Sequence, residues 1–575
     1  TVRSLVARLD LAGAGEVAGG RLDLDNLGSP SAIGFSPLGD YALLTAQAND
    51  ALVLIDVFTG AIAAEVATGA APQGVAVDAA TRRAFIQDFL GRSVTVINLG
   101  PFLLRGDATL PRLAQVATQA SEPLAAPVLT GKKLFYSASP RLALDGYISC
   151  AACHLDGGHD GLTWDFSDRG EGLRNTIDLR GRRGIGHGRV HWSGNFDEIQ
   201  DFEHDIRSTF GGSGLMTDAQ FNQGTRNQPL GDRKAGVSSD LDALTAYVAS
   251  LNSVGRAPER TAAGALSADA TAGKNLFHRL NCAACHGGSD FTDSTTAQRH
   301  DVGTFGPGSG RRLGSPIDGL DTPTLRGLFS GGPFLHDGSG ADLVTVFARS
   351  GAAHGNLDQL TTTESTQLRA YLRALDASEP APPAPALPVH WQWGDIGGAP
   401  ISGSSSTGSD GRFTLTSTGA DLWGRADAAQ FARRRLAGDG VVRARVDSLR
   451  GANAWSKAGV MLRADLTPGS INGAALVTIS NGLGFSYRSR PGDTTTWLTG
   501  PSGTAPTWLR LERTGDTVTA SSSTDGSTWR SIGTRTLTLG SACWAGVTVV
   551  GHAGNQPATA VFSAIQVTAR PAATN

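Results

Sequence analysis

Two copies of the pentapeptide Cys-Ala-Ala-Cys-His constrain this chain more than any other feature of its sequence. They occupy positions 150–154 and 282–286. Two thiols on one helical turn can form thioethers with the two vinyl groups of a haem, and the adjoining histidine then lies beneath the iron. A zinc site would need four ligands, and neither half of the chain offers a second cysteine pair. The motifs therefore predict two covalently bound c-type haems, held by Cys150, Cys153, His154, Cys282, Cys285 and His286.

The cysteine count and the net charge restrict the cellular compartment and the classes of partner that we expect for the protein. Four of the five cysteines belong to the two motifs, and we expect the fifth, Cys543, to be a buried core residue. Haem attachment to this motif is completed outside the cytoplasmic membrane in bacteria, which predicts a periplasmic or extracellular protein. The net charge of −3 argues against a nucleic-acid partner. No run of the sequence approaches the roughly 18 apolar residues of a membrane span.

A chain of 575 residues is too long for a single core, and its first part contains a repeat. Pro30-Ser-Ala-Ile-Gly-Phe matches Pro72-Gln-Gly-Val-Ala-Val, and Leu52-Val-Leu-Ile-Asp matches Val94-Thr-Val-Ile-Asn, both at an offset of 42 positions. Short strands with this period are typical of β-propeller blades and resemble YVTN-type propellers. Two blades over residues 1–105 make only a partial propeller, because a ring needs four or more. We therefore expect a separate polypeptide, either a partner subunit or the N-terminal piece of a cleaved precursor, to supply the remaining blades. The alternative is that these blades belong to the same chain but are absent from this sequence. For the repeat itself, coincidental β-hairpins are the alternative.

Two similar halves follow the blades. Gly131-Lys-Lys-Leu-Phe precedes the first motif, and Gly273-Lys-Asn-Leu-Phe precedes the second. Each half closes with a segment whose apolar residues, including Tyr247 or Tyr371, recur at helical spacing. The pattern predicts two mainly α-helical cytochrome c domains in tandem, at residues 125–255 and 256–378.

The last third of the chain has a different pattern of residues. Residues 379–389 form a Pro-rich linker, which we expect to be extended. Residues 390–572 alternate apolar and polar positions between Gly, Asp and Ser turns, which predicts an all-β sandwich of two sheets. This part resembles the concanavalin-like jelly rolls of secreted bacterial proteins. The resemblance implies a binding module, with a surface glycan as candidate ligand, whose deletion should leave the haem spectra unchanged.

Further motifs in residues 125–378 resemble the bacterial dihaem cytochrome c peroxidases and MauG proteins. The stretches Thr322-Pro-Thr-Leu-Arg-Gly-Leu and Gly332-Pro-Phe-Leu-His-Asp-Gly-Ser match the signature that follows the second haem in that family. In the first half, Arg174-Asn-Thr and His191-Trp-Ser-Gly match two further family stretches. The resemblance implies that Trp192 lies between the haems and relays electrons, with core packing as its alternative role.

The same resemblance implies a calcium ion between the two cytochrome domains. The family ligands fall on the side chain of Asn175 and on the backbone carbonyls of Gly331 and Pro333, with water completing the shell. Oxygen ligands of this kind suit a hard cation. Gly331 departs from the threonine that is frequent in the family, but a carbonyl ligand does not depend on the side chain.

The first haem site departs from the peroxidase pattern. The glutamine and glutamate that the family uses opposite its first haem fall here on Phe202 and Gly212. Charged groups nearby could replace them, with a solvated or salt-bridged helix face as the alternative; these are Glu203, His204, Arg207 and His187. The histidine that blocks the first iron in many relatives falls on Ser167, so we expect an iron that is five-coordinate or bound by water.

The second haem site departs as well. The methionine or tyrosine ligand of the family aligns with Ser350. His354, four residues further on, is the best remaining candidate for the second axial ligand, and an ordinary loop histidine is its alternative role. Two histidine ligands would give a lower reduction potential than a histidine and a methionine.

These features support three functional hypotheses. The leading one is a MauG-like or peroxidase-like oxidoreductase that reacts with H₂O₂ or O₂ at the first haem and exchanges electrons with a redox partner protein through the second. The second is a non-catalytic electron-transfer or structural subunit of a larger assembly, which the missing glutamine and glutamate favour. The third is a haem-dependent oxygenase, which the apolar Phe202 favours.

Overall fold

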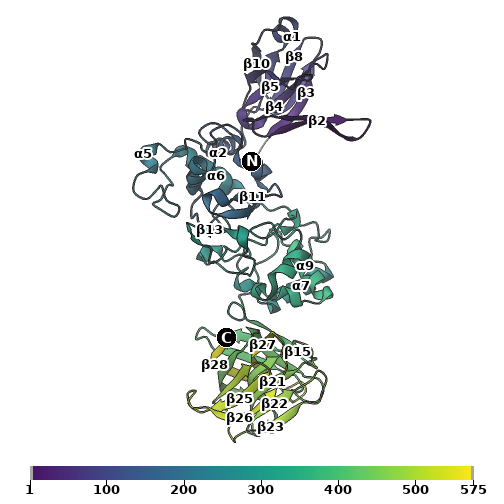
Figure 1. Ribbon diagram of the computed structural model, residues 1–575, viewed down its shortest axis with the longest axis vertical. Helices are drawn as coiled ribbons and strands as arrows, with labels where there is room; N and C mark the ends of the chain where they lie inside the picture. The colour runs from purple at the N-terminus through teal and green to yellow at the C-terminus, as the bar shows by residue number, and fades with distance from the viewer. Residues whose placement is uncertain (1–3, 571–575) are drawn as a thin grey trace. The chain divides into compact units, whose positions relative to one another are not determined.

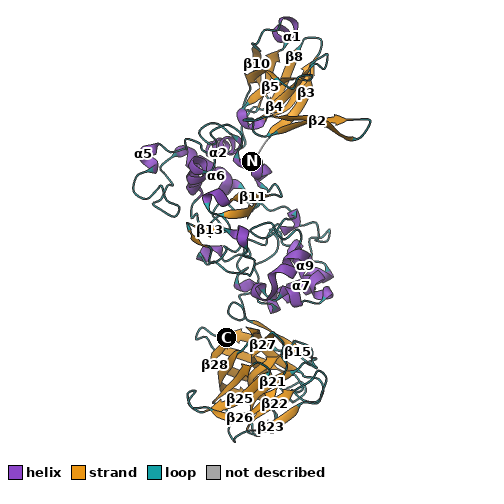
Figure 2. Ribbon diagram, viewed as in Figure 1, coloured by secondary structure: helices purple, strands orange, loops and turns teal. Residues whose placement is uncertain are grey.

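The computed structural model describes residues 4–570, which form two compact units built largely of β-sheet (Figure 1, Figure 2). The first unit contains the chain up to Ala257 together with Asp293–Val346 and Leu375–Glu379. The second contains Pro258–Thr292, Phe347–Ala374 and the chain from Pro380 onward. The segment Asp293–Val346, which we expected in the second cytochrome domain, thus belongs to the first unit. No helix of the described residues is long and apolar enough to cross a membrane.

Two four-stranded antiparallel sheets and a preceding hairpin form the start of the first unit. The hairpin pairs β1 (Leu5–Asp10) with β2 (Gly15–Asp23). The first sheet has the order β3-β4-β5-β6 (Pro30–Phe35, Tyr41–Ala46, Ala51–Asp56, Ile62–Ala67). The second has the order β10-β9-β8-β7 (Arg112–Ala117, Ser93–Asn98, Arg83–Asp88, Pro72–Asp78), with helix α1 (Gly100–Arg105) between β9 and β10. Strands β3, β4 and β5 begin 42 positions before β7, β8 and β9, which is the offset of the sequence repeat.

The inner strands of the first sheet, β4 and β5, are buried on both faces, as their nearly unbroken apolar sequences predict. One face packs against the second sheet through a shared core that includes Leu43, Leu52, Leu54, Ile86 and Ile97. The other face packs against the hairpin through a separate core that includes Leu22, Leu24, Leu44 and Val53. The second sheet therefore has one covered face, whereas the first has two.

Each half of the haem region is built on the same pair of helices. In the first unit α2 (Ala126–Tyr136) packs against α6 (Ser239–Ser250), and in the second α7 (Ala268–Arg279) packs against α9 (Thr362–Arg373). In both pairs an aromatic residue that precedes the haem motif meets the tyrosine of the closing helix edge to face. The ring centres are 5.0 Å apart for Phe135 and Tyr247 and 5.6 Å apart for Phe277 and Tyr371.

The glycine of the repeated Gly-Lys-x-Leu-Phe motif lies where the two helices of each pair approach closely. A Cβ on Gly131 would lie 1.8 Å from the backbone oxygen of Ala243, and a Cβ on Gly273 would lie 1.9 Å from that of Gln367. Any side chain would push the helices apart, so only glycine permits this approach. The duplicated motif thus specifies a close helix crossing in each half.

Short elements surround these helix pairs. They are α3 (Cys150–Cys153), the pair β11 (Thr163–Phe166) and β12 (Gly172–Asn175), α4 (Glu203–Ser208), α5 (Asp218–Phe221), the pair β13 (Arg311–Arg312) and β14 (Ser315–Pro316), and α8 (Leu343–Ser350). Much of the chain between them is loop, which is where functional residues are commonly found.

The last part of the second unit is a sandwich of two seven-stranded antiparallel sheets. One sheet has the order β15-β18-β27-β20-β21-β22-β23 (Gln392–Ile396, Ala429–Ala437, Ala542–Val550, Lys457–Arg463, Asn472–Thr478, Leu483–Arg488, Thr496–Thr499). The other has the order β16-β17-β28-β19-β24-β25-β26 (Ser404–Thr407, Phe413–Ser417, Ala558–Ala569, Gly440–Arg450, Thr507–Thr514, Thr517–Ser523, Arg530–Thr536). Apolar side chains from the inner faces form one core, in which Cys543 is fully buried as expected.

Candidate functional site

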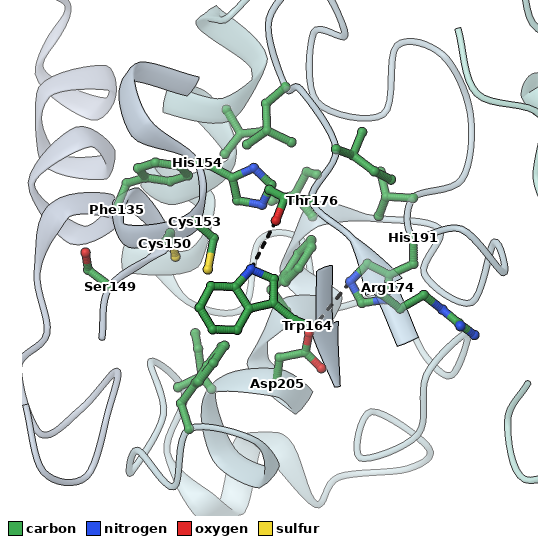
Figure 3. Close-up of a pocket in the computed structure, with 18 of the residues that line it drawn as sticks. Phe135, Ser149, Cys150, Cys153, His154, Trp164, Arg174, Thr176, His191 and Asp205 are labelled. Carbon is green, nitrogen blue, oxygen red and sulfur yellow. Dashed lines mark hydrogen bonds and ion pairs between the residues drawn. The ribbon is translucent and has the colours of Figure 1, made fainter. Parts of the chain in front are cut away.

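The first Cys-Ala-Ala-Cys-His motif borders a cavity in the first unit. Residues Cys150–Cys153 form the single turn of α3, so that both thiols and the ring of His154 reach the same cavity (Figure 3). The cavity has a volume of about 210 Å³, and most of its wall is apolar. The apolar wall includes Phe135, Trp164, Phe166, Ile199, Phe202 and Leu244.

Three of the four motif thiols lie where burial disfavours the thiolate form. Burial raises the pKa of Cys150 to about 11 and the pKa of Cys153 to about 12. Burial likewise raises the pKa of Cys282 to about 12. Nucleophilic and zinc-binding cysteines have a lowered pKa instead. These environments therefore fit thioether attachment to an apolar cofactor better than metal or redox chemistry at sulfur.

Both motif histidines are oriented by the same kind of contact, between Nδ1 and a backbone oxygen. The Nδ1 atom of His154 lies 3.2 Å from the backbone oxygen of Gly158, and the Nδ1 atom of His286 lies 3.2 Å from that of Phe291. A hydrogen bond from Nδ1 to a carbonyl fixes the tautomer and leaves Nε2 as the metal-binding atom. Each motif thus presents its histidine in the form that an axial haem ligand requires.

Two further features of the first cavity suit a haem. Arg174 and Arg182 both line the cavity, and Arg182 lies where burial lowers its pKa to about 10. A haem brings two propionate carboxylates, which are natural partners for arginine. The donor set, the apolar wall and these cations together fit a covalently attached haem.

The second motif lies opposite another histidine. His354 belongs to the second unit, as His286 does, and the centres of the two imidazole rings are 6.2 Å apart. Two imidazoles that share one metal ion at bond lengths of about 2 Å have ring centres about 6 Å apart. Burial, together with the neighbouring His286, lowers the pKa of His354 to about 4, so the ring is neutral, as a metal ligand must be. The side chain of Ser350, the aligned family position, lies outside the described residues.

The wall of the first cavity also carries a group of ionisable residues. His191, Phe202, Asp205 and Glu171 all line the cavity. The ring of His191 packs against that of Phe202 at 5.1 Å, with an angle of 77° between the ring planes. Its Nε2 atom lies 3.6 Å from Oδ2 of Asp205, and its Nδ1 atom lies 3.9 Å from Oε2 of Glu171. An imidazole between two carboxylates therefore stands inside the cavity.

The charged residues expected to replace the missing glutamine and glutamate lie elsewhere. Glu203 is fully buried, where its carboxylate accepts hydrogen bonds from the backbone N–H groups of Leu215 and Met216 and from Arg207. Arg207 also contacts Asp218 and the Met216 carbonyl. Within the described part of the chain neither residue lines the cavity. Glu203 ties a loop to its helix, which is a structural role.

His204 does not line the cavity either, because its ring turns toward Phe196 and Phe221. Phe202, the position aligned with the family glutamine, does line it, whereas Gly212 does not. Ser167 is also absent from the cavity wall, and its N–H donates to the side chain of Asp165.

Trp192 follows His191 and lines the same cavity. Its indole N–H donates to the backbone oxygen of Asn175 at 2.8 Å, and its own carbonyl accepts from the N–H of Asp321 at 2.8 Å. The ring is thus fixed by hydrogen bonds at the edge of the cavity. This placement is compatible with both of the roles considered for Trp192.

Two of the three expected calcium ligands lie together. Nδ2 of Asn175 lies 2.6 Å from the backbone oxygen of Pro333, and Oδ1 of Asn175 is buried and accepts no hydrogen bond from the described residues. Rotating the amide by half a turn would place two oxygen atoms side by side, since its N and O atoms are interchangeable in shape. Gly331 lies two positions before Pro333 with φ of 105°, in open space.

Sequence reasoning missed the grouping of His191, Asp205 and Glu171. The available signal was His191 itself, an ionisable residue next to the tryptophan of a recognisable motif. Its two carboxylate neighbours are 14 positions after it and 20 positions before it, and only the folded chain brings them together.

Comparisons with known proteins found relatives over part of the chain. Hydrazine synthase subunit gamma from Kuenenia stuttgartiensis is 30% identical over 274 residues, which cover 40% of this chain and 73% of that protein. The methylamine utilization protein MauG from Methylorubrum extorquens is 28% identical over 305 residues, which cover 45% of this chain and 81% of that protein. A solved structure of Kuenenia stuttgartiensis hydrazine synthase matches 44% of this chain and 89% of its own at 26% identity, with a TM-score of 0.33. No family model matches the chain.

Proposed function

The chain belongs to the protein family of hydrazine synthase subunit gamma and MauG, and from this premise we propose that it is a dihaem oxidoreductase with one reactive and one electron-transferring haem. The observation that carries the proposal is the difference between its two sites. His286 faces a second imidazole at 6.2 Å, whereas His154 faces a cavity with ionisable side chains. A haem with two histidine ligands exchanges electrons, and one with a free position can bind H₂O₂ or O₂.

Individual residues of the chain have distinct roles in this proposal. His154 and His286 would each hold one haem iron, and their Nδ1 contacts with backbone oxygens fix the ring orientation. His354 closes the second site. Trp192, held at the rim of the first cavity, is our candidate for the side chain that relays electrons between the sites. The apolar wall of the first cavity excludes water from the reaction.

A calcium ion is part of the proposal. The amide oxygen of Asn175 and the carbonyl of Pro333 would bind it, with Gly331 and water completing the oxygen shell. Calcium at this point would fix Asn175, whose backbone oxygen holds the indole of Trp192. Removing calcium should therefore alter electron transfer more than it alters haem content.

We also propose three kinds of partner. A one-electron carrier protein would exchange electrons with the second haem in the periplasm or outside the cell. A surface glycan is our candidate ligand for the C-terminal sandwich. The two sheets β3–β6 and β7–β10 are proposed to be blades of a propeller, whose other blades cover the uncovered face of the second sheet.

One observation favours an alternative function. Phe202 places an apolar ring in the cavity where the related peroxidases carry an amide, which suits an apolar substrate and O₂. We keep a haem-dependent oxygenase as the second candidate. A purely electron-carrying protein fits less well, because it has no use for a cavity that contains His191, Asp205 and Glu171.

Haem counting and peroxide consumption test the proposal together. The purified chain should contain two haems by the pyridine haemochrome assay and should consume H₂O₂ when a one-electron donor is supplied. The double variant Cys282→Ala, Cys285→Ala should retain one haem and lose donor-dependent turnover. A native protein with two haems that consumes no peroxide would favour the oxygenase, which an oxygen-uptake measurement would then identify.

A further inference from the structure

We propose that His191 is the acid–base residue of the first haem cavity, with Asp205 and Glu171 as the residues that position it. The inference rests on the proposed function and extends it to a residue that differs from the family pattern. The glutamine and glutamate positions of the related peroxidases are Phe202 and Gly212 here, so neither can move a proton. The imidazole of His191 offers the group that is missing.

The position of His191 supports this role. Its side chain lines the cavity into which Cys150, Cys153 and His154 project, and it comes from a different element (Figure 3). The ring packs against Phe196, at 4.3 Å between ring centres, and against Phe202, at 5.1 Å, and these two rings also contact each other at 5.2 Å. These aromatic rings hold the imidazole in place without forming hydrogen bonds to its nitrogen atoms.

The surrounding charges suit a proton-transfer group. Nε2 faces Asp205 at 3.6 Å and Nδ1 faces Glu171 at 3.9 Å, distances that allow electrostatic stabilisation but exceed a direct hydrogen bond. Nδ1 is buried and has no hydrogen-bond partner within the described residues. Arg174 and Arg182 also line the cavity and offset part of the negative charge. Two carboxylates and two guanidinium groups thus surround the imidazole.

The backbone at this residue is also unusual. His191 has φ of 67°, in the left-handed region that residues with a side chain seldom adopt. Val190 and Phe196 form an isolated bridge around the turn, and the N–H of Gly194 donates to the His191 carbonyl. Strained conformations persist where the surrounding structure enforces them, and they concentrate at functional sites. The turn aims the imidazole into the cavity.

The proposed chemistry is a proton shift within bound peroxide. Neutral His191 accepts the proton of one peroxide oxygen at Nε2 and donates it to the other oxygen, which leaves as water when the O–O bond breaks. The overall change is H₂O₂ with two protons and two electrons to two molecules of water. The electrons come from the one-electron carrier protein that the proposed function already requires.

Cyanide binding to the ferric holoprotein tests the inference without measuring turnover. Hydrogen cyanide must lose its proton on entering the cavity, so the binding rate, followed by absorbance, reports on the base there. We expect His191→Gln and His191→Phe each to slow binding by about 100-fold or more, the usual effect of losing a general base. The native rate should depend on pH, and both variants should lose this dependence.

A matched control is available in the same unit. His300 is a half-buried histidine whose Nε2 lies 2.7 Å from Asp293, and it does not line the first cavity. His300→Gln should leave the cyanide rate unchanged. Haem content and thermal unfolding identify any variant that fails to fold.

The outcomes separate the inference from the proposed function. A native protein that binds no cyanide has no open haem, which overturns the proposed function and the inference with it. Native binding that neither His191 variant slows overturns the inference alone. Slowed binding with an unchanged pH profile would assign His191 to steric shaping of the cavity and would also overturn it.

Discussion

At the scale of single residues, the second haem site depends on His354. Replacing it with alanine should leave haem attachment through Cys282 and Cys285 intact but remove one axial ligand. We expect the low-spin ferric EPR signal to be lost and a second high-spin signal to replace it. His390→Ala, an exposed histidine in the same unit, is the control and should change neither signal. An unchanged low-spin signal in His354→Ala would refute the ligand assignment.

A second residue-scale prediction concerns Asp321, whose backbone N–H supports Trp192. Burial raises the pKa of this carboxyl to about 7, although a hydrogen bond from Ser294 and the charge of Arg182 oppose the rise. Because its folded-state pKa exceeds the unfolded value, ionisation costs stability, which falls as pH rises from about 4 to 7 and stays low above. Asp321→Asn should therefore unfold like the native chain at pH 4 and be more stable at pH 8 by about 4 kcal/mol. Thermal unfolding at both pH values measures the difference, and an equal difference at the two pH values would contradict the assignment.

The sequence determines some residues of the sites and not others. The two pentapeptides predict the attachment residues because thioether and axial bonds are formed by neighbours in sequence. His354 was reached by elimination, since few alternative ligands exist in that segment. The charge of Glu203 makes it a candidate, yet the fold directs its carboxylate to the backbone N–H groups of Leu215 and Met216. Which way a helical side chain points depends on tertiary contacts that a local pattern does not contain.

At the scale of elements, the two helix crossings depend on glycine. Gly131→Ala would place a methyl group 1.8 Å from the Ala243 carbonyl oxygen, so α2 must move away from α6. We expect a loss of about 3 kcal/mol in the free energy of unfolding, together with a weaker Phe135–Tyr247 contact beside the first motif. Gly255→Ala is the control, because nothing lies within 4 Å of a Cβ there. Equal unfolding midpoints in denaturant for the two variants would contradict the close-crossing argument.

The sequence predicted these helix pairs from apolar spacing and from the repeated motif, and it predicted the strands of the first two sheets from their period. It did not predict how the haem region divides. The segment Asp293–Val346 follows the second motif but belongs to the compact unit of the first. This segment is largely loop. Individual contacts, such as the hydrogen bond from Asp321 to Trp192, hold it to the first unit. Contacts of this kind produce no periodic pattern in the sequence.

At the scale of the whole molecule, the structure revises the expected independence of the C-terminal sandwich. The side-chain amide of Gln392, in β15, donates to the Gly355 carbonyl beside His354. Trp393 packs against His278 of α7. Deleting residues 390–575 should therefore perturb the second haem while leaving the first unchanged. Separate EPR signals for the two haems report this, and two unchanged signals would restore the independent-module interpretation.

The second blade-like sheet supplies another prediction at this scale. Phe85, Val94 and Val96 stand at the repeat positions of Leu43, Leu52 and Leu54, which the next sheet buries completely. Phe85 is 37% exposed and Val116, on the strand beside Val94, is 55% exposed. If a further blade covers this face, Val116→Asp should weaken its association, whereas Leu38→Asp, at an exposed turn, should not. Native mass spectrometry of the isolated complex would show the loss of the partner, and equal retention in both variants would contradict the proposed interface.

The central claim is that the chain carries two haems of unequal coordination. Low-temperature EPR of the ferric protein, combined with a pyridine haemochrome count, tests it most directly. The account predicts two haems per chain, one giving a high-spin signal from the open site at His154 and one giving a low-spin signal from the site shared by His286 and His354. A count of one or none, or two haems with the same spin state, would contradict it.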